Sequence, residues 1–416
     1  MKIVMTTGNK NSIRDIVSKT LAQTGVVDIH THLLDPAFGS LNLWGIDDLL
    51  TYHYLVAEVF RARPDMAYNT FWGMSKIQQA DLIWNELFVK RSPVSESCRG
   101  VLTVLHALGL DANADTLDDI RAFFSKLEIH EYVNRVFDLA KVSRVYMTND
   151  PLDDDERAVW ENGFDRDSRF VGVLRLDSAL MSWPAGTAGL RSMGYSVDSS
   201  LSGKTISEIR RYLNDWCDKL DARYMAISLP PTFRYPDLES SVTDLMVKAV
   251  FPIARERGIP VALMIGVKKL VNPGLKVGGD SVGKADIETV ERMACDFSDV
   301  KFMITMLSRE NMHELCVAAR KFNNIIPFGC WWFLNDPSLI REITAMRFEL
   351  LGMSFIPQHS DARVLDQLIY KWAHSRAIIG DVLAGKYIDI IHAGRVVTEQ
   401  NIQRDIQNLF NGSLTQ

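Results

Sequence analysis

Eight short apolar runs, each about the length of a β-strand, are spaced along the chain. They cover residues 26–32, 142–148, 170–177, 224–229, 259–267, 300–307, 325–332 and 355–361. Stretches with helical periodicity separate the later runs, for example residues 309–322 and 337–352. Strands that alternate with helices form parallel sheets, and eight such units can close on themselves. The pattern therefore predicts an α/β fold, a (β/α)8 barrel of the TIM type.

The gap between the first and second runs is too long for a loop between a strand and a helix, and its pattern is helical. Ser75 and Gln78 have the spacing of a capping box, which predicts a helix start. The apolar residues expected to share one face of this helix are Ile77, Ala80, Trp84 and Leu87. Ser92 before Pro93 predicts the start of another helix.

We interpret residues 41–140 as a helical subdomain inserted after the first strand. Loops at the C-terminal ends of barrel strands build the active site, so the insertion is expected to cover the barrel mouth as a lid or pocket wall. Residues 1–40 then hold an N-terminal helix and the first strand. Residues 141–416 hold the remainder of the barrel and the C-terminal helices.

The composition narrows the class of protein. The chain has 416 residues, of which 47% are hydrophobic, enough for one large barrel. Its formal net charge is −6, with acidic and basic residues mixed, which argues against a nucleic-acid partner. Five scattered cysteines without a CxxC pair, no signal-peptide core and no stretch of ~18 apolar residues predict a cytoplasmic protein without a membrane partner. The sequence leaves open whether it forms a homo-oligomer.

Two histidines, His30 and His32, end the first run. Residues two apart in a strand point to the same side, so both imidazoles are expected to project together at the C-terminal rim of the barrel. Such a pair suits one divalent cation. The alternative is two solvated or packed histidines at a strand end.

Asp361 ends the eighth run, and Arg363 follows two residues later. Closure of the barrel brings the last strand beside the first, so Asp361 is expected to reach a cation held by the two histidines. Asp361 could alternatively be the N-cap of a helix that begins near Ala362, and both roles could hold together. His359 shares the face of Asp361 but is expected to lie deeper, so we rank it below Asp361.

Histidines in this pattern on the first strand, with an aspartate on the eighth, resemble the amidohydrolase superfamily. Further segments resemble the uronate isomerase family, of which the chain looks like a divergent branch. They are HTHL after the first strand, TNDP at 148–151, RLD at 175–177, GCWWFLND at 329–336 and HSDAR at 359–363, with TYHYLVAEV at 51–59 and RSPVSESCRG at 91–100 in the insertion. These segments span almost the whole chain in the expected order.

The resemblance implies metal-assisted aldose–ketose isomerisation of hexuronates through a cis-enediol, from D-glucuronate to D-fructuronate and from D-galacturonate to D-tagaturonate. Asp361, or a water activated at the cation, would take the C2 proton, and the cation would polarise O1 and O2. His30, His32 and Asp361 would hold one divalent ion, expected to be zinc. A metal-dependent hydrolase and a non-catalytic carbohydrate-binding barrel are the alternatives.

Two arginines at strand ends suit the C6 carboxylate and the developing oxyanion of a hexuronate, because a guanidinium binds carboxylates in a plane. Arg175 would hold the carboxylate, or else form a rim salt bridge with Asp177. Arg363 would stabilise the oxyanion, or else be an arginine at a helix N-terminus.

Aromatic residues complete the expected site. Tyr54 resembles the family's active-site tyrosine, with His53 beside it toward the substrate, although Tyr54 could instead pack within the helix. Trp331 and Trp332 are expected to point to opposite faces of the seventh strand. At most one of them, taken to be Trp331, should then line the pocket.

The sequence departs from the superfamily pattern in two strands. Members commonly add a lysine on strand four and a histidine on strand five, whereas these runs read AISLPP and ALMIGVKK, with Met264 in place of the histidine. Three protein ligands favour a mononuclear site.

Overall fold

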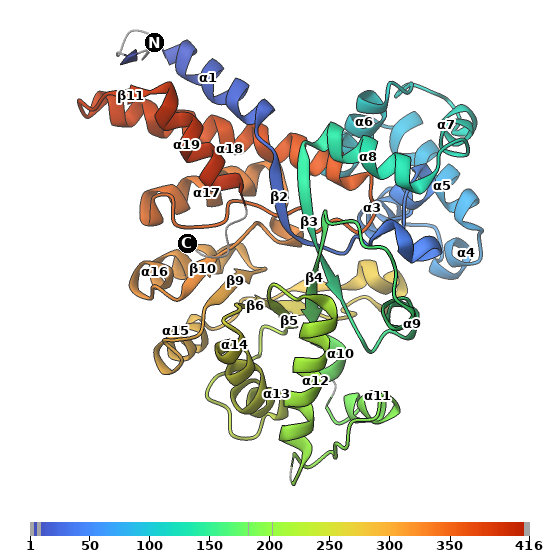
Figure 1. The fold of residues 1–416 in the computed structure, drawn as a ribbon. Coiled ribbons are helices and arrows are strands. Elements are labelled where there is room, and N and C mark those ends of the chain that lie inside the picture. Colours follow the sequence, from blue (N-terminus) through green and yellow to red (C-terminus); the bar gives the residue numbers. More distant parts are fainter. Residues whose placement is uncertain (1–3, 6–9, 182, 202, 412–416) are drawn as a thin grey trace.

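The structure, a computed structural model, describes residues 4–5, 10–181, 183–201 and 203–411 (Figure 1). Seven parallel strands form one curled sheet in the order β10-β9-β6-β5-β4-β3-β2. They are β2 (Val26–Thr31), β3 (Val142–Asn149), β4 (Phe170–Arg175), β5 (Met225–Leu229), β6 (Val261–Ile265), β9 (Phe302–Met306) and β10 (Ile325–Pro327). The first seven predicted runs each contain one of these strands, and the predicted fold class is confirmed.

The eighth predicted run closes the barrel without forming a regular strand. Ile356 makes an isolated parallel bridge to Phe328, next to β10. At the other end of the run, the amide of Asp361 donates to the carbonyl oxygen of His30 at 3.1 Å. The prediction of a regular eighth strand is wrong because Pro357 has no amide hydrogen and Asp361 has φ +54°, outside the strand region.

Helices follow the strands and cover the outside of the sheet. The main ones are α9 (Asp154–Asn162), α12 (Thr205–Leu220), α14 (Phe251–Arg257), α15 (Ile287–Asp296), α16 (Met312–Lys321), α17 (Pro337–Leu351) and α18 (Gln367–His392). Shorter elements between them are α10 (Asp177–Leu180), α11 (Gly186–Ser192), α13 (Ser241–Leu245), η3 (Met246–Val250), η5 (Arg309–Asn311) and η6 (Trp332–Leu334). The long helix α18 packs against α17 and also against helices of the predicted insertion (Figure 1).

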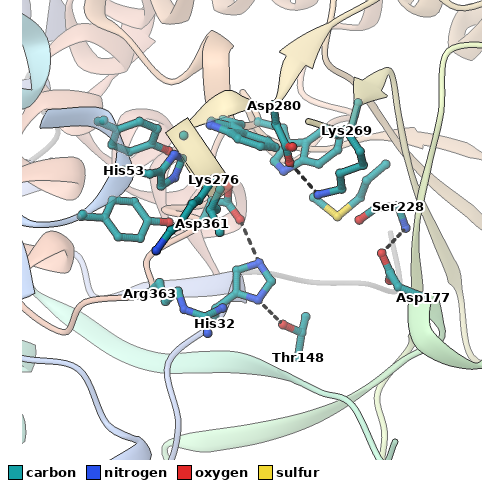
Figure 2. A pocket seen from close by; sticks show the side chains of 18 of the residues that line it. His32, His53, Thr148, Asp177, Ser228, Lys269, Lys276, Asp280, Asp361 and Arg363 are labelled. Carbon is teal, nitrogen blue, oxygen red and sulfur yellow. Dashed lines mark hydrogen bonds and ion pairs between the residues drawn. The ribbon is translucent and has the colours of Figure 1, made fainter. Parts of the chain in front are cut away.

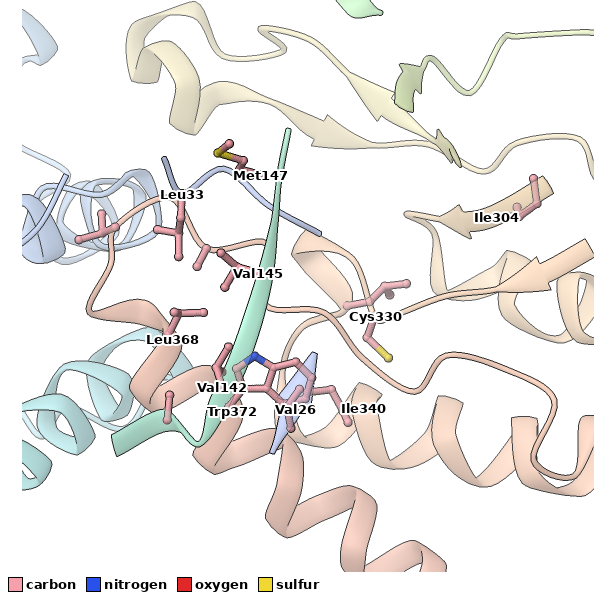
Figure 3. Packing of buried hydrophobic residues seen from close by; sticks show 14 of the residues in the cluster. Val26, Leu33, Val142, Val145, Met147, Ile304, Cys330, Ile340, Leu368 and Trp372 are labelled. Carbon is pink, nitrogen blue, oxygen red and sulfur yellow. The ribbon is translucent and has the colours of Figure 1, made fainter. Parts of the chain in front are cut away.

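Alternation along β6 shows how the barrel separates two apolar layers. Ala262 and Met264 belong to a buried cluster inside the barrel, whereas Val261, Leu263 and Ile265 belong to the layer outside it. All five are buried because both faces of a parallel sheet are covered. Figure 3 shows part of the outer layer, where Val26, Val142 and Val145 lie near Leu368 and Trp372 of α18.

Seven α-helices lie between β2 and β3, where the insertion was predicted. They are α2 (Ile46–Leu50), α3 (His53–Ala62), α4 (Tyr68–Trp72), α5 (Lys76–Trp84), α6 (Glu96–Leu108), α7 (Asp118–Phe124) and α8 (Ile129–Ala140), with η1 (Pro36–Leu41) before them and η2 (Asn85–Val89) after α5. The predicted capping box of Ser75 and Gln78 is present.

Two details of that prediction are wrong. Ile77 is 53% exposed, because Ile83 takes the buried place on α5 beside Ala80 and Trp84. The helix expected at Ser92 begins only at Glu96, where Ser95 accepts a hydrogen bond from the amide of Cys98 and caps it.

Further elements flank the barrel. α1 (Lys10–Gln23) packs on α18, and β1 (Val4–Met5) pairs with β11 (Val397–Thr398) ahead of α19 (Glu399–Phe410). After β6, the strands β7 (Val267–Lys268) and β8 (Ser281–Val282) form a hairpin that carries η4 (Pro273–Gly279). Among the described helices, none is long and apolar enough to cross a membrane.

Candidate active site

A cavity of about 460 Å³ opens at the C-terminal ends of the barrel strands (Figure 2). Its wall combines strand ends, the start of α3 and the hairpin after β6. The lining residues predicted from the sequence are His30, His32, His53, Tyr54, Arg175, Trp331, Asp361 and Arg363, and Met264 lines the cavity as well. Segments from across the chain therefore meet in one cavity.

Three ligand-type side chains converge at the base of this cavity. The Nε2 atoms of His30 and His32 lie 3.6 and 3.4 Å from Oδ1 of Asp361. The ligand-type atoms of all three residues lie within 4.8 Å of one another. The two Nε2–Oδ1 distances exceed those of ordinary N–H···O hydrogen bonds, and Oδ1 of Asp361 is buried without a hydrogen bond. Two imidazoles and one carboxylate in this arrangement suit a small divalent cation.

A buried carboxylate, Asp28, holds the closing segment against the first strand. It accepts hydrogen bonds from the backbone amide of Ser360 at 3.0 Å and from the indole N–H of Trp372 at 2.8 Å. Burial raises the pKa of Asp28 to about 6, although these hydrogen bonds act in the opposite direction. Because Ser360 directly precedes Asp361, Asp28 fixes the backbone that presents the carboxylate of the cluster.

Burial sets the charge of the histidines. It lowers the pKa of His30 well below its ordinary value and lowers the pKa of His32 as well, so both are neutral at pH 7. For Asp361, burial alone would raise the pKa, but contact with His32 and attraction by both histidines outweigh burial and bring the pKa below its ordinary value. At neutral pH the cluster is one carboxylate facing two neutral imidazoles.

The start of α3 supplies an aromatic wall. His53 lies between Tyr52 and Tyr54, with ring centroids 4.3 Å from each. Burial raises the pKa of Tyr54 well above its ordinary value, so Tyr54 keeps its phenolic proton. Behind the ring of Tyr54 stands the buried Lys371, whose Nζ lies 5.3 Å from the ring centroid. Tyr54 therefore lines the cavity and also packs within the protein, so the two roles considered for it are compatible.

Four cationic side chains line the cavity, and only two of them have an acidic partner among the described residues. Arg175 pairs with Asp177 at 3.2 Å, and Lys269 pairs with Asp280 at 2.7 Å. No ion pair joins Arg363 or Lys276 to a carboxylate in the described part of the chain. Nζ of Lys276 instead lies 4.2 Å from the ring centroid of Trp72.

The comparison with solved structures identifies the family. Over 96% of this chain and 94% of the other, the structure matches a uronate isomerase from Bacillus halodurans C-125, with 52% sequence identity and a TM-score of 0.94. The chain belongs to the uronate isomerase family. No protein-family model and no curated protein sequence matches it.

Two more distant structures share the fold of this family member. A uronate isomerase from Thermotoga maritima has 14% identity and a TM-score of 0.78, and covers 96% of this chain and 95% of the other. A glucuronate isomerase from Caulobacter crescentus has 14% identity and a TM-score of 0.77, and covers 97% of this chain and 93% of the other. The family resemblance drawn from the sequence is confirmed.

Several expectations about the site of this uronate isomerase can now be corrected. Asp361 is not a helix N-cap, since α18 begins at Gln367 with Asp366 in the N-cap position. Both Trp331 and Trp332 line the cavity, because β10 ends at Pro327 and strand alternation does not extend to them. Trp332 has φ +46°, which lies outside the strand region.

Other lining residues were missed from the sequence. Lys269, Lys276 and Asp280 reach the cavity from the hairpin after β6 (Figure 2). Thr148, also a lining residue, contacts His32 from the adjacent strand β3, and Tyr224, which lies behind the cavity wall just before β5, contacts His30. The sequence does show a tyrosine in an apolar run and a threonine in the TNDP segment, but it does not show which atoms their hydroxyls contact.

Proposed function

We propose that this member of the uronate isomerase family interconverts D-glucuronate with D-fructuronate, and D-galacturonate with D-tagaturonate, through a cis-enediol. The single observation that carries the proposal is that the His-His-Asp cluster shares one cavity with two guanidinium groups. One belongs to Arg175, which is paired with Asp177, and the other to Arg363, which has no acidic partner among the described residues. An aldose–ketose isomerase for anionic sugars needs both features. The cluster serves the reacting carbons, and a guanidinium serves the carboxylate.

The residues at the base of the cavity fit a single divalent cation, which we propose to be zinc. The fit rests on a buried carboxylate oxygen without a hydrogen bond and two neutral imidazoles that face it. Such an ion, held by His30, His32 and Asp361, would polarise the hydroxyl and carbonyl oxygens of the open-chain sugar. Met264 lines the cavity where a strand-five histidine was expected, which favours one ion over two.

Asp361 is the proposed base that removes the proton from C2. Its lowered pKa keeps it ionised at neutral pH. Because it lies beside both histidines, it would be next to the sugar oxygens that lose and gain double-bond character. The proton then returns to C1, and Tyr54, with its proton retained by burial, donates a hydrogen bond to the enediolate oxygen beside Arg363.

Arg175 is the proposed anchor for the C6 carboxylate, with His53 and Trp331 as contacts along the sugar. Arg175 lines the cavity at the end of β4 and keeps its charge next to Asp177. Asp177 is itself oriented by the amide of Ser228 at 3.3 Å, so the guanidinium is held in a defined place before substrate arrives. The pairing with Asp177 and the binding of a substrate carboxylate are compatible because a guanidinium has five donors.

The decisive experiment is an assay of purified protein with D-glucuronate and D-galacturonate, which follows ketose formation and then repeats the reaction in deuterated water. We expect both ketoses, with deuterium at C1, since an enediol passes the proton through an exchangeable group. Ketose without any deuterium over many turnovers would contradict the enediol route, and no ketose at all would contradict the activity.

The proposed cellular location and domain division rest on simpler features. We propose a cytoplasmic protein, in line with five free cysteines, four of them buried. We also propose the division into residues 1–40, 41–140 and 141–416, since the helices between β2 and β3 supply one wall of the cavity and the barrel supplies the rest.

A further inference from the structure

Each histidine of the cluster touches one hydroxyl group through its other ring nitrogen. Nδ1 of His30 lies 3.1 Å from the phenol oxygen of Tyr224. Nδ1 of His32 lies 3.0 Å from Oγ1 of Thr148 (Figure 2). Both hydroxyl-bearing residues are buried. In each ring, Nε2 faces Asp361 and Nδ1 faces the hydroxyl.

Each of the two hydroxyls donates its single hydrogen to a backbone carbonyl oxygen. The phenol of Tyr224 donates to the carbonyl oxygen of Ile29 at 2.6 Å, and the hydroxyl of Thr148 donates to the carbonyl oxygen of Thr31 at 3.0 Å. A carbonyl oxygen can only accept, so the hydroxyl proton must point toward it. Burial also raises the pKa of Tyr224 well above its ordinary value, which keeps this proton in place.

A hydroxyl whose only hydrogen is already donated in one hydrogen bond can only accept a hydrogen bond from a second neighbour. The contact with Nδ1 is then a hydrogen bond only if Nδ1 carries the hydrogen. A neutral imidazole has one N–H, so Nε2 is left with its lone pair. In the opposite tautomer, either the hydroxyl oxygen or Nδ1 would face another lone pair inside the protein.

The two hydroxyls come from different places in the barrel. Thr148 lies on β3, which pairs directly with β2. Tyr224 immediately precedes β5, which is separated from β2 by two strands of the sheet. Its ring lies in the apolar cluster inside the barrel, stacked on Tyr146 with centroids 6.1 Å apart. The hydroxyl contact to His32 therefore comes from the strand adjacent to β2, and the hydroxyl contact to His30 comes from the barrel interior.

We infer that Tyr224 and Thr148 are positioning residues that hold His30 and His32 in the Nδ1–H tautomer, with both Nε2 lone pairs directed at the cation site before a cation arrives. The inference rests on the proposed cation site. It adds a division of labour, because Asp361 supplies charge while the two hydroxyls determine which nitrogen of each imidazole is a ligand. Neither hydroxyl needs to touch the substrate.

The direct test reads the tautomers in metal-free protein. Histidine labelled with ¹⁵N, in protein treated with a chelator, gives distinct long-range ¹H–¹⁵N patterns for the two tautomers of a neutral ring. The chain has nine histidines, so His30 and His32 can be assigned from His30→Gln and His32→Gln spectra. We expect the Nδ1–H tautomer for both rings in the wild type.

Matched variants separate the two positions. Thr148→Val should release the ring of His32 into mixed tautomers and leave His30 unchanged, whereas Thr148→Ser, which keeps the hydroxyl, should behave like the wild type. Tyr224→Phe should release His30 and leave His32 unchanged, whereas Tyr146→Phe alters the stacked neighbour and should release neither ring. Near-ultraviolet circular dichroism checks that each variant is folded.

Zinc affinity gives the second readout, measured by competition with a chromophoric chelator. We expect Thr148→Val and Tyr224→Phe each to weaken zinc binding by about 10- to 100-fold, and Thr148→Ser and Tyr146→Phe to change it little. Wild-type rings in the Nε2–H tautomer, or zinc affinity unaltered in both released variants, would overturn the inference. Failure of the wild type to bind zinc while both rings show Nδ1–H would instead remove the proposed metal site and leave the tautomer assignment supported.

Discussion

On one side of the cavity, which we name the barrel side, stand His30, His32, Thr148, Tyr224 and Asp361. On the other, the outer side, stand residues 51–54, Trp72 and the hairpin of residues 267–282. Barrel-side polar groups are mostly buried and bound to backbone atoms of strands or of the closing segment. The outer side is held by contacts of the helices α3 and α4 with the hairpin.

The outer side has a different construction. The indole N–H of Trp72 donates to the carbonyl oxygen of Gly274 at 2.8 Å, and the side-chain amide (Nδ2) of Asn272 donates to the phenol oxygen of Tyr68 at 2.9 Å. Around these contacts the hairpin exposes apolar side chains, including Val277 at 66%. The comparison indicates that the groups proposed to hold the cation and to move the proton are fixed by strands and by the closing segment, whereas the hairpin on the outer side has many exposed apolar side chains.

The largest effect should come from the barrel side. Asp361→Asn keeps the shape of the side chain and removes the base and the negative charge, so kcat/KM for D-glucuronate should fall by about 10²- to 10⁴-fold. Steady-state kinetics measures this, with the melting temperature as a check on folding. A loss below tenfold in a folded variant would show that another group moves the C2 proton.

A smaller effect is expected where a barrel strand meets the substrate's carboxylate. Charge-assisted contacts contribute roughly 1.5–3 kcal/mol, so Arg175→Met should lower kcat/KM for both uronates by about one to two orders of magnitude. The corresponding neutral sugar, already a poor substrate, should be affected far less. Equal losses for charged and neutral sugars would mean that Arg175 has a structural role, and unchanged kinetics would transfer the anchor role to Arg363.

Acid should destabilise the buried region in a predictable direction. Burial lowers the pKa of His53 and of His359 to about 4, whereas an unfolded histidine titrates near 6.5. Between pH 6.5 and 4 the unfolded state therefore binds more protons, and the free energy of unfolding should fall as the pH falls, by up to about 1.4 kcal/mol per pH unit for each such histidine.

Asp28 acts in the opposite direction, since its pKa is raised to about 6, and other buried carboxylates with a raised pKa, such as Asp366, act with it. The lowered pKa values of His30, His32 and His374 add to the histidine effect. Urea unfolding of chelator-treated protein at pH 7, 6 and 5 measures the balance, and His359→Gln should reduce the slope. Equal or greater stability at pH 5 than at pH 7 would contradict the direction.

The smallest effect is expected on the outer side. Lys276 has no acidic partner among the described residues and lines the cavity, so Lys276→Met should lower kcat/KM for uronates by at most about fivefold, as an exposed charge contact of about 0.2–1 kcal/mol would. Lys269→Met is the matched control, because Asp280 already neutralises Lys269. A loss of tenfold or more for Lys276→Met would show that the outer side is as strictly arranged as the barrel side.

The sequence was sufficient for the barrel side wherever regular periodicity applied. His30 and His32 follow from strand spacing, and Asp361 follows from the closure that brings the last run beside the first. Seven of the eight runs contain strands, and those in the middle of the sheet, such as β6 and β9, are buried along their whole length, as parallel strands covered on both faces are. The roles assigned to these residues remain predictions that the experiments above test.

Prediction failed where the backbone leaves regular geometry. Gly329, with φ +62°, turns the chain just after β10, and a Cβ there would lie 1.9 Å from Cδ2 of His359. Alternation therefore could not be extended to Trp331 and Trp332. The hydroxyls of Tyr224 and Thr148 could not be assigned either, because their partners are carbonyl oxygens whose positions depend on how strands align across the barrel.

The hydrogen bond from the amide of Ser360 to Asp28 joins positions 332 residues apart in the chain. During synthesis at about 5–20 residues per second, the ribosome needs roughly 15–70 seconds after making the first strand to deliver the segment that carries the third ligand. Throughout that interval the nascent chain displays two histidines without their carboxylate. Retention of the proposed cation would thus report the completion of translation and of barrel closure together, and a chain truncated before the closing segment at residues 355–361 should leave the ribosome without one.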